Sequence, residues 1–498
     1  MVEPLSIVAT VDLCIKWGAI LVEKCSAFAH AEDEVTGGLL RIRNCWIRTK
    51  FQLQLVQRLA DTLDDDHRKV HYETLEMLVA KLKNTVRLIE SISTDEGVRR
   101  IKYAVLQTKI ERTIVDLENW QRLFDPSWYL LMVAAAPQID DDLKAYEQTA
   151  TPATRAPLSS ARRLRSVRHP RAVKQPPIFY KESDTASLVI HDIPMSPARL
   201  GLRGDASKTL ILDSRIYPSD RIGRNQIEKD VRDLARKLVQ ADPFEFGLLQ
   251  CKGVVKHSDD GSSIPPSFTF IFRLPPGCSE PHSLRHCLGN MRRPDSLSDR
   301  FRLASELAKS VLYVHTFGFV HKNIRPDTVL VLKHRNTALG SVFLVGFDTF
   351  RSEHGHTALM GSTKWQRSLY QHPSRIGDHV IQNYLVQHDI YSLGVCLLEL
   401  GLWQSFVMYG AHGSEVACPL IGSPDPPEFK DRLLALARGE LRSRMGDLYS
   451  QVVETCLTSL DPGNADFGDK SEFQDADGIQ VGVRYIEKIT MRLSSISV

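Results

Sequence analysis

The sequence predicts a multidomain protein in which an N-terminal all-α helix bundle is followed by an α+β part. Residues 1–135 carry four apolar stripes at helical spacing. A stretch rich in arginine and proline follows, and strand-like and helix-like patterns alternate from about residue 196 onward. Because 498 residues are too many for one hydrophobic core, we expect two or more domains.

The composition is ordinary for a globular protein, with 43% hydrophobic residues, 25% charged residues and a net charge of +3. This balance favours no specific nucleic-acid partner. The nine cysteines form no Cys-x-x-Cys pair, so we expect reduced thiols, a cytoplasmic location and no metal site. The N-terminus lacks a basic region followed by a cleavage site, and no window is apolar enough to span a membrane.

The four stripes of the bundle lie at residues 5–22, 42–63, 75–89 and 103–117. For the last three, the simplest interpretation is a buried core face. The first helix is apolar around more than half of its circumference. It therefore either lies at the centre of the bundle or buries its apolar surface at a second site. We therefore predict that its apolar residues form a membrane-active surface, namely Leu5, Val8, Val11 and Ile15.

Residues 136–195 are predicted to be a brace followed by a basic linker. Between Thr151 and Pro177 the chain has five prolines and no acidic residue, a composition typical of a mostly disordered segment. Its basic residues include Arg162, Arg163, Arg165, Arg168, Arg171 and Lys174. They could simply be solvated, or they could attract anionic lipid at about 1 kcal/mol each. Nuclear targeting or loose RNA contact would use the same charges.

Residues 196–498 are predicted to contain a small sheet followed by a larger helical region. Thr209–Leu212 and Ser267–Leu274 are typical of strands, and 226–240 is typical of a helix. Pro275-Pro276-Gly277 then marks a hinge-like break. We place the smaller part at about 200–276 and the larger part at about 277–498.

Four motifs in this region, taken together, resemble the protein kinase fold. In chain order they are His321-Lys322-Asn323, Phe343–Asp348, Tyr370-Gln371-His372-Pro373 and Asp389–Leu400. The resemblance implies a bilobal α+β domain with the two parts as its lobes. It also implies that the retained positions brace the fold, namely His321, Pro326, Phe347, Pro373, Asp389 and Gly394.

The residues that carry out phosphoryl transfer in the family are replaced at the matching positions. Asn323 stands where the catalytic base is expected, while Thr328 and Gly346 stand where the two metal ligands are expected. Arg215 falls near the position of the phosphate-binding lysine, and the chain contains no Gly-x-Gly. The resemblance therefore implies a pseudokinase, which is not an enzyme and needs no cofactor. Metal-independent nucleotide binding is left open but is not expected.

The N-terminal bundle resembles the HeLo and HeLo-like domains of filamentous fungi. The resemblance rests on Met1–Ile7 opening an apolar helix, on Trp46 and on the Phe124–Trp128 element. The order of bundle, linker and kinase-like domain is similar to that of the mixed-lineage kinase domain-like protein. It implies a bundle that self-associates and perturbs anionic membranes in programmed cell death or heterokaryon incompatibility, controlled by an unknown protein activator.

Two alternatives remain at this point. The chain could be a non-enzymatic signalling scaffold without any membrane step, or an atypical but active Ser/Thr protein kinase.

Overall fold

The computed structural model forms two compact units, Met1–Arg165 and Ser166–Val498. The first is helical and the second contains helices and sheets. The residues that the structure describes are 4–26, 33–93, 99–168, 177–203, 209–216, 221–257, 267–290, 296–334, 339–348, 365–376, 384–409, 415–422, 428–468 and 479–496. At some helix ends within these ranges only the backbone is described.

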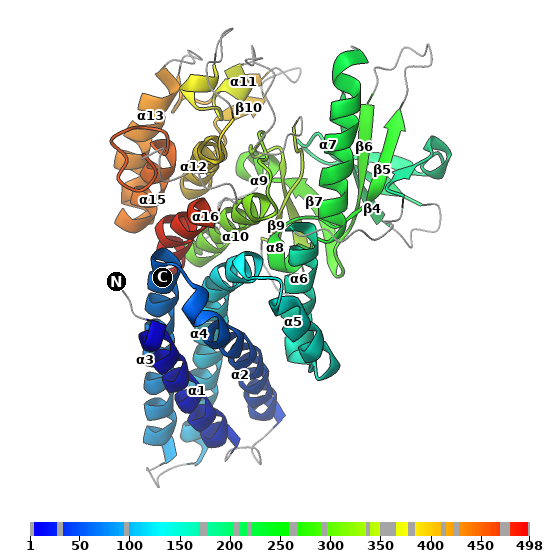
Figure 1. Ribbon diagram of the computed structural model, residues 1–498. Coiled ribbons are helices and arrows are strands. Elements are labelled where there is room, and N and C mark those ends of the chain that lie inside the picture. The colour runs from blue at the N-terminus through cyan, green and yellow to red at the C-terminus, as the bar shows by residue number, and fades with distance from the viewer. Residues whose placement is uncertain are drawn as a thin grey trace. The chain divides into compact units, whose positions relative to one another are not determined.

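The first unit is built on four long helices that run alongside one another (Figure 1). They are α1 (Pro4–Ser26), α2 (Asp33–Leu59), α3 (Asp65–Ser93) and α4 (Arg99–Ala134), with a short 3₁₀ turn at Ala60–Thr62. Helix α1 packs on α3 and α2, and α4 packs on α2 and α3. None of the helices in the described part of the chain is long and apolar enough to cross a membrane.

Helix α1 turns its apolar face into this bundle. Ile7, Val11 and Cys14 are fully buried, whereas Leu13 on the opposite face is 41% exposed. Gly18 allows the closest approach, because a Cβ atom there would lie 2.0 Å from the Trp46 ring. The apolar residues of α1 are therefore core residues in this closed arrangement.

Helix α4 extends beyond the predicted stripe at 103–117 and continues through Phe124–Trp128 and Pro126 to Ala134. A proline inside a helix removes one backbone hydrogen bond. Side-chain contacts on both sides compensate: Trp120 and Phe124 stack with centroids 4.6 Å apart, and Trp128 is fully buried. Tertiary packing thus overrides the local helix breaker.

The segment 136–195 was predicted to be a brace and a basic linker, mostly disordered between Thr151 and Pro177, and the expected disorder is wrong for residues 152–168. Helices α5 (Ile139–Gln148) and α6 (Pro152–Arg168) occupy its first half, and Leu158, Ala161 and Leu164 of α6 are buried. Strands β1 (Phe179–Tyr180) and β2 (Val189–Asp192) in its second half already belong to a sheet. The remaining segment, 169–176, lies outside the described residues.

The contacts of Arg165 explain why the basic stretch 152–168 forms a packed helix. Its side chain is 2% exposed, and its Nε forms an ion pair 2.6 Å from Asp140. Its Nη1 donates to the carbonyl oxygens of Met132 and Ala135, and its Nη2 donates to that of Ala136 at 3.3 Å. The guanidinium therefore caps the C-terminal end of α4, where carbonyl groups lack helical partners.

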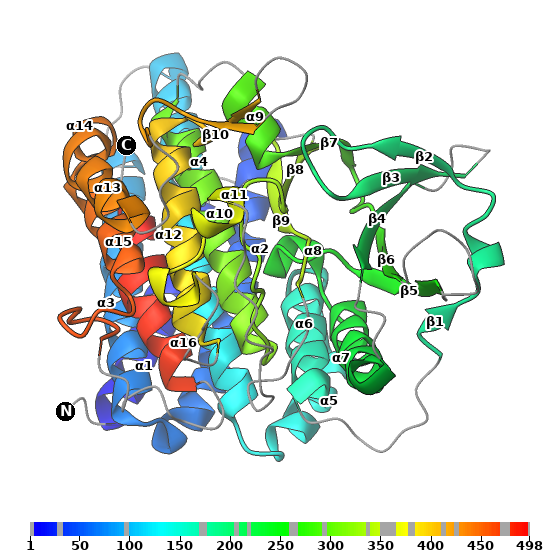
Figure 2. The ribbon, with the colours of Figure 1, turned by 90° about the horizontal axis from the view of Figure 1, so that it is seen from above.

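The second unit begins with a six-stranded sheet. Its strands lie in the order β1-β5-β6-β4-β3-β2 (Figure 2). The strands that follow β1 and β2 are β3 (Arg199–Leu202), β4 (Thr209–Ile216), β5 (Cys251–His257) and β6 (Ser267–Arg273). All pairs are antiparallel except β1 with β5. Helix α7 (Arg221–Val239) packs on β5, and the short α8 (Pro243–Phe246) follows it.

The rest of the unit combines a three-stranded sheet with a helical core. The sheet contains β7 (Cys278–Ser283), β8 (Val329–His334) and β9 (Ser341–Leu344). Helix α12 (Val386–Leu402) is buried at every position and lies between α10 (Leu297–Thr316) and α15 (Asp447–Leu457) (Figure 2). The other elements are α9 (Leu284–Asn290), α11 (Trp365–Ser368), β10 (Val407–Tyr409), β11 (Glu415–Ala417), α13 (Phe429–Leu436), α14 (Arg442–Met445), α16 (Ile479–Tyr485) and α17 (Arg492–Ser494).

We predict that Arg165→Met lowers the free energy of unfolding of the first unit by about 2–3 kcal/mol, because three carbonyl groups and Asp140 lose their partner. Urea denaturation followed by tryptophan fluorescence measures this. Arg155→Met, which removes an exposed arginine of the same helix, is the matched control and should change stability by less than about 0.5 kcal/mol. Equal midpoints for both variants would show that Arg165 does not cap α4.

Candidate functional site

The candidate site is formed where the loop 321–328, between α10 and β8, meets the segment 345–348 that follows β9. The pairing of β8 with β9 brings the two together, with Val329 opposite Leu344. Beyond the strands, the Val345 N–H donates to the Thr328 carbonyl at 3.0 Å, and the Asp348 N–H donates to the His321 carbonyl at 3.2 Å. We call these two segments the central loops.

Asp389 lies in the first turn of α12 and binds the central loops through its carboxylate. Its carboxylate is fully buried and accepts the backbone N–H groups of His321 at 2.6 Å and Lys322 at 2.9 Å. It also contacts His315 Nε2 at 3.2 Å and accepts the Tyr384 hydroxyl at 2.8 Å. Burial alone would raise the pKa of Asp389, but the hydrogen bond and charge of His315 outweigh it and lower that pKa.

The two residues bound by Asp389 have distinct conformations. Lys322 adopts a left-handed backbone with φ of 63°, which is unfavourable for a lysine unless its surroundings hold it. His321 is fully buried, its Nε2 lies 3.1 Å from the Val345 carbonyl, and its ring contacts Phe347 at 4.3 Å between centroids. Burial lowers the pKa of His321 to about 4, so its imidazole is neutral and structural.

Asn323 and Thr328 face inward and bind the loops to each other. The Asn323 side chain donates to the Gly346 carbonyl at 2.7 Å. The Thr328 hydroxyl is fully buried and donates to the carbonyls of Asn323, at 2.6 Å, and Arg325, at 3.0 Å. Both side chains therefore stabilise the loop structure. Asn323 points its N–H₂ group, which is a donor and not a base, toward the Gly346 carbonyl.

Gly346 joins the central loops to strand β4. Its φ of +85° favours glycine, and a Cβ atom there would lie 2.5 Å from Thr328 Cγ2 and 2.7 Å from Arg215 Nη2. Its N–H donates to the buried carboxylate of Asp213 at 2.8 Å. Asp213 forms an ion pair with Arg215 at 2.9 Å, and burial raises the pKa of Asp213 despite this neighbour. The Arg215 guanidinium thus lies where a side chain at position 346 would project.

The other predicted brace positions have packing roles. Phe347 is buried against His321, and Pro373 begins a 3₁₀ turn at Pro373–Arg375. A Cβ atom at Gly394 would lie 2.7 Å from Cys456 Cβ, so glycine lets α12 approach α15 closely. The Pro326 carbonyl accepts the Arg285 N–H at 3.0 Å.

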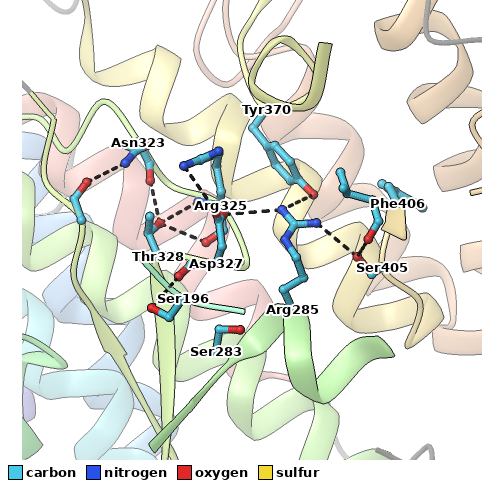
Figure 3. Close-up of polar contacts among 12 residues, drawn as sticks. Ser196, Ser283, Arg285, Asn323, Arg325, Asp327, Thr328, Tyr370, Ser405 and Phe406 are labelled. Atoms are coloured by element: carbon cyan, nitrogen blue, oxygen red, sulfur yellow. Dashed lines mark hydrogen bonds and ion pairs between the residues drawn. The ribbon is translucent and has the colours of Figure 1, made fainter. Parts of the chain in front are cut away.

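A second buried network, which the sequence analysis missed, surrounds Arg285 of α9 (Figure 3). Its guanidinium donates to the hydroxyl groups of Tyr370 at 3.3 Å and Ser405 at 3.2 Å, and lies 3.5 Å from Asp327. Tyr370 in turn donates to both oxygens of Glu399 at 3.0 Å. Burial raises the pKa of Glu399 to about 7. No local pattern could reveal this network, since its members are spread from residue 285 to residue 405.

The residues predicted to act on membranes are not part of this site, and those of α1 belong to the first unit. Val11 is fully buried and Val8 and Ile15 are half-buried, while the Leu5 side chain lies outside the described residues. Among the basic residues, Arg162 forms an ion pair with Glu147 and Arg163 lies half-buried on α6. The Arg168 side chain, Arg171 and Lys174 lie outside the described residues.

The central loops do not fit a magnesium-bound nucleotide. Gly346 has no side chain, and the Asn323 side chain and the Thr328 hydroxyl are already bonded within the loops. The carboxylates at the central loops are engaged as well: Asp213 pairs with Arg215, Asp327 with Arg325 at 3.1 Å and Asp348 with Arg367 at 3.7 Å, and Asp389 accepts backbone N–H groups. Across the described ranges, no group of three or more His, Cys, Asp or Glu residues could hold a metal ion.

We predict that the second unit loses stability as the pH falls from 6.5 towards 4. Burial lowers the pKa of His321 to about 4 and that of His388 to about 3, from an ordinary 6.5. The unfolded chain therefore binds more protons than the folded chain in this range, and each histidine contributes a slope of up to about 1.4 kcal/mol per pH unit. Urea midpoints from pH 7 to 4.5 should fall less steeply for His321→Gln than for wild type. The exposed His191→Gln should retain the wild-type slope, and identical slopes for all three proteins would contradict the assignment.

Comparison with known proteins gives one weak similarity. No protein-family model matches the chain. A segment of 111 residues, 22% of this chain, is 29% identical to a probable serine/threonine-protein kinase of Dictyostelium discoideum. The match covers 6% of that protein. The chain is therefore similar to a kinase over part of its length.

Proposed function

We propose that the Ser166–Val498 unit is a kinase-like domain that does not transfer phosphate and instead regulates the N-terminal bundle. The observation that carries the proposal is Gly346, whose N–H binds Asp213 and whose missing side chain leaves room for Arg215. The partial similarity to a serine/threonine-protein kinase supports the kinase-like interpretation.

The order of elements also supports this interpretation. An antiparallel sheet with one long helix, α7, precedes a helical region organised around the buried α12. The loop carrying His321 and Asn323 and the segment carrying Gly346 lie side by side, as the four sequence motifs require for a kinase-like domain. In this proposal the six-stranded sheet, which already begins with β1 and β2 before residue 200, is the smaller lobe, and the part that follows it is the larger lobe.

The chemistry argues against phosphoryl transfer. That reaction depends on positioned charges, namely a base for the hydroxyl proton and metal ions on the phosphates. Asn323 donates a hydrogen bond where a base would accept a proton, and a guanidinium lies next to Gly346 where a cation-binding carboxylate is expected. Each such loss costs on the order of 10² or more in rate.

We predict that the full chain shows no magnesium-dependent transfer of the terminal phosphate of ATP to itself or to a generic substrate protein. Radiolabelled ATP measures the transfer, with an active kinase as the positive control. Asp348 follows Gly346 by two residues and its side chain is 35% exposed, so it is the carboxylate that we assign to an atypical kinase for this test. Asp348→Asn should match wild type at background, whereas magnesium-dependent labelling that disappears in this variant would establish an active kinase.

We further propose that the helical unit is the effector and acts at anionic membrane surfaces after it opens and self-associates. The support is the burial of Ile7, Val11 and Cys14, because opening would transfer this apolar face to a new partner. Burial of apolar surface yields about 25 cal/mol per Å², which can drive either self-association or membrane contact. An upstream protein would shift the balance between the closed and open states.

We predict that residues 1–168 release dye from anionic liposomes and that Val8→Glu reduces the release at least about tenfold. Val8 is one of the predicted membrane-active residues of α1 and is half-buried, so a charge there opposes lipid contact by the apolar face. Leu13→Glu, on the opposite face of α1 at a side chain 41% exposed, is the matched control and should retain the release. Leakage that is absent, or that both variants reduce equally, would favour a scaffold that acts only through protein contacts.

A further inference from the structure

Strand β1 is an added strand at one edge of the six-stranded sheet, where it runs parallel to β5. Phe179 lies opposite Val254, and Tyr180 lies opposite Val255. The Val254 N–H donates to the Ile178 carbonyl at 2.9 Å, which extends the pairing by one residue. The residues of β1 fall in the predicted linker, so a segment of that linker completes the sheet of the second unit.

The two aromatic side chains of β1 point to opposite faces of the sheet, because successive residues of a strand alternate. The centroid of the Phe179 ring lies 6.2 Å from that of Phe268 and 5.4 Å from the Arg232 guanidinium carbon of α7. The Lys252 Nζ lies 5.8 Å from the centroid of the Tyr180 ring. Each ring therefore has its own contacts, as in peptides that bind the edge of a sheet as an extra strand.

Gly253 of β5 makes room for the added strand. A Cβ atom there would lie 2.1 Å from the Tyr180 ring and 2.8 Å from the Ile178 carbonyl oxygen. The three heavy atoms nearest to that Cβ position all belong to these two residues. A side chain at position 253 would therefore meet the added strand before any other part of the sheet. Two residues after β1, Glu182 contacts Nδ1 of His257 at 2.9 Å and extends the attachment.

The same segment of a second copy would fit the β5 edge equally well. Exchange of a segment between identical chains replaces each contact by an identical one, so it costs no interaction within the sheet. Ten residues separate the end of α6 at Arg168 from Phe179, and ten residues can span about 35 Å. The copy that supplies the strand can therefore keep its own α6 in place.

We propose that β1 is an exchangeable strand and that the β5 edge takes up Ile178–Tyr180 of a second copy of this chain. The exchange joins the second units of two molecules. The chain's own strand competes for the same edge as an intramolecular ligand, so exchange is favoured when the chains are concentrated. This contact goes beyond the proposed function, which assigns self-association to the helical unit, and it does not depend on whether the second unit transfers phosphate.

Cysteine cross-linking between two versions of the full chain tests the exchange. One version carries Tyr180→Cys and the other carries Val255→Cys, at two positions that are paired across β1 and β5. Adjacent strands lie about 5 Å apart, which a disulfide can bridge. Oxidation of an equimolar mixture should give a covalent dimer that contains one chain of each version. Wild type mixed with either version is the control and should give no such dimer.

Gly253→Val should act in opposite directions in the two versions. In the Tyr180→Cys chain it displaces that chain's own strand, which becomes available to the partner, and should raise the dimer yield about fivefold. In the Val255→Cys chain it blocks the receiving edge and should abolish the dimer. Gly289→Val in α9, where a Cβ atom has no neighbour within 4 Å, is the matched control and should leave the yield unchanged in both versions.

The remaining outcomes overturn the proposal. An equal effect of Gly253→Val in both versions would show that the substitution acts on the fold or that the dimer forms outside the β5 edge. Absence of the dimer at every chain concentration, even with Gly253→Val in the Tyr180→Cys chain, would show that β1 pairs only within its own chain.

Discussion

The hydrogen bonds between the Asp389 carboxylate and the backbone of His321 and Lys322 are the interaction on which the second unit depends. A carboxylate buried without partners would be strongly unfavourable, and so would the left-handed backbone of an unsupported lysine. The backbone N–H groups of His321 and Lys322 give the buried carboxylate its partners, and the carboxylate in turn holds Lys322 in its left-handed conformation. Because α12 is buried along its whole length, this bond fixes the central loops relative to the core.

The central loops direct their polar groups toward one another. Asn323 binds the Gly346 carbonyl, Thr328 binds carbonyls of its own loop, and Asp213 binds both Arg215 and the Gly346 N–H. These bonds compensate for the burial of the groups that make them, although Arg215 Nε and His321 Nδ1 are buried without a hydrogen-bond partner. The loops carry no carboxylate at position 346 and no basic atom at position 323. Under the proposed kinase-like interpretation, the residues that preserve the shape of the loops lack the groups that phosphoryl transfer needs.

The Arg285 network follows the same physical logic at a different place. A buried arginine, tyrosine and glutamate satisfy one another where α9, the segment before the 3₁₀ turn and α12 meet. Removing one partner of such a group leaves an uncompensated buried charge, so its members stabilise the fold only together. In the first unit, Arg165 plays a comparable part by joining α6 to the end of α4.

The sequence by itself determined the division into a helical unit and a mixed unit, and most of the elements. Apolar periodicity reports which face of a helix or strand is buried, and this signal is local. It located the strands at Thr209 and Ser267 within a few residues and found the four helices of the bundle, although α2 and α3 begin well before the predicted stripes and α4 continues well beyond its stripe. The motifs also located the central loops, because Gly346 and Asn323 lie at fixed distances from β8 and β9.

Only the tertiary structure decided the roles that depend on distant partners. A stretch with prolines and no acidic residue was predicted to be disordered, but Asp140 and three carbonyl groups of α4 give Arg165 its place. Likewise, Arg215 meets Gly346, and Ser196 meets Asp327, across more than a hundred residues of chain. The composition of a segment indicates how much apolar surface that segment can bury with its own residues. The contacts of Arg165, Arg215 and Ser196 instead depend on partners that distant segments supply.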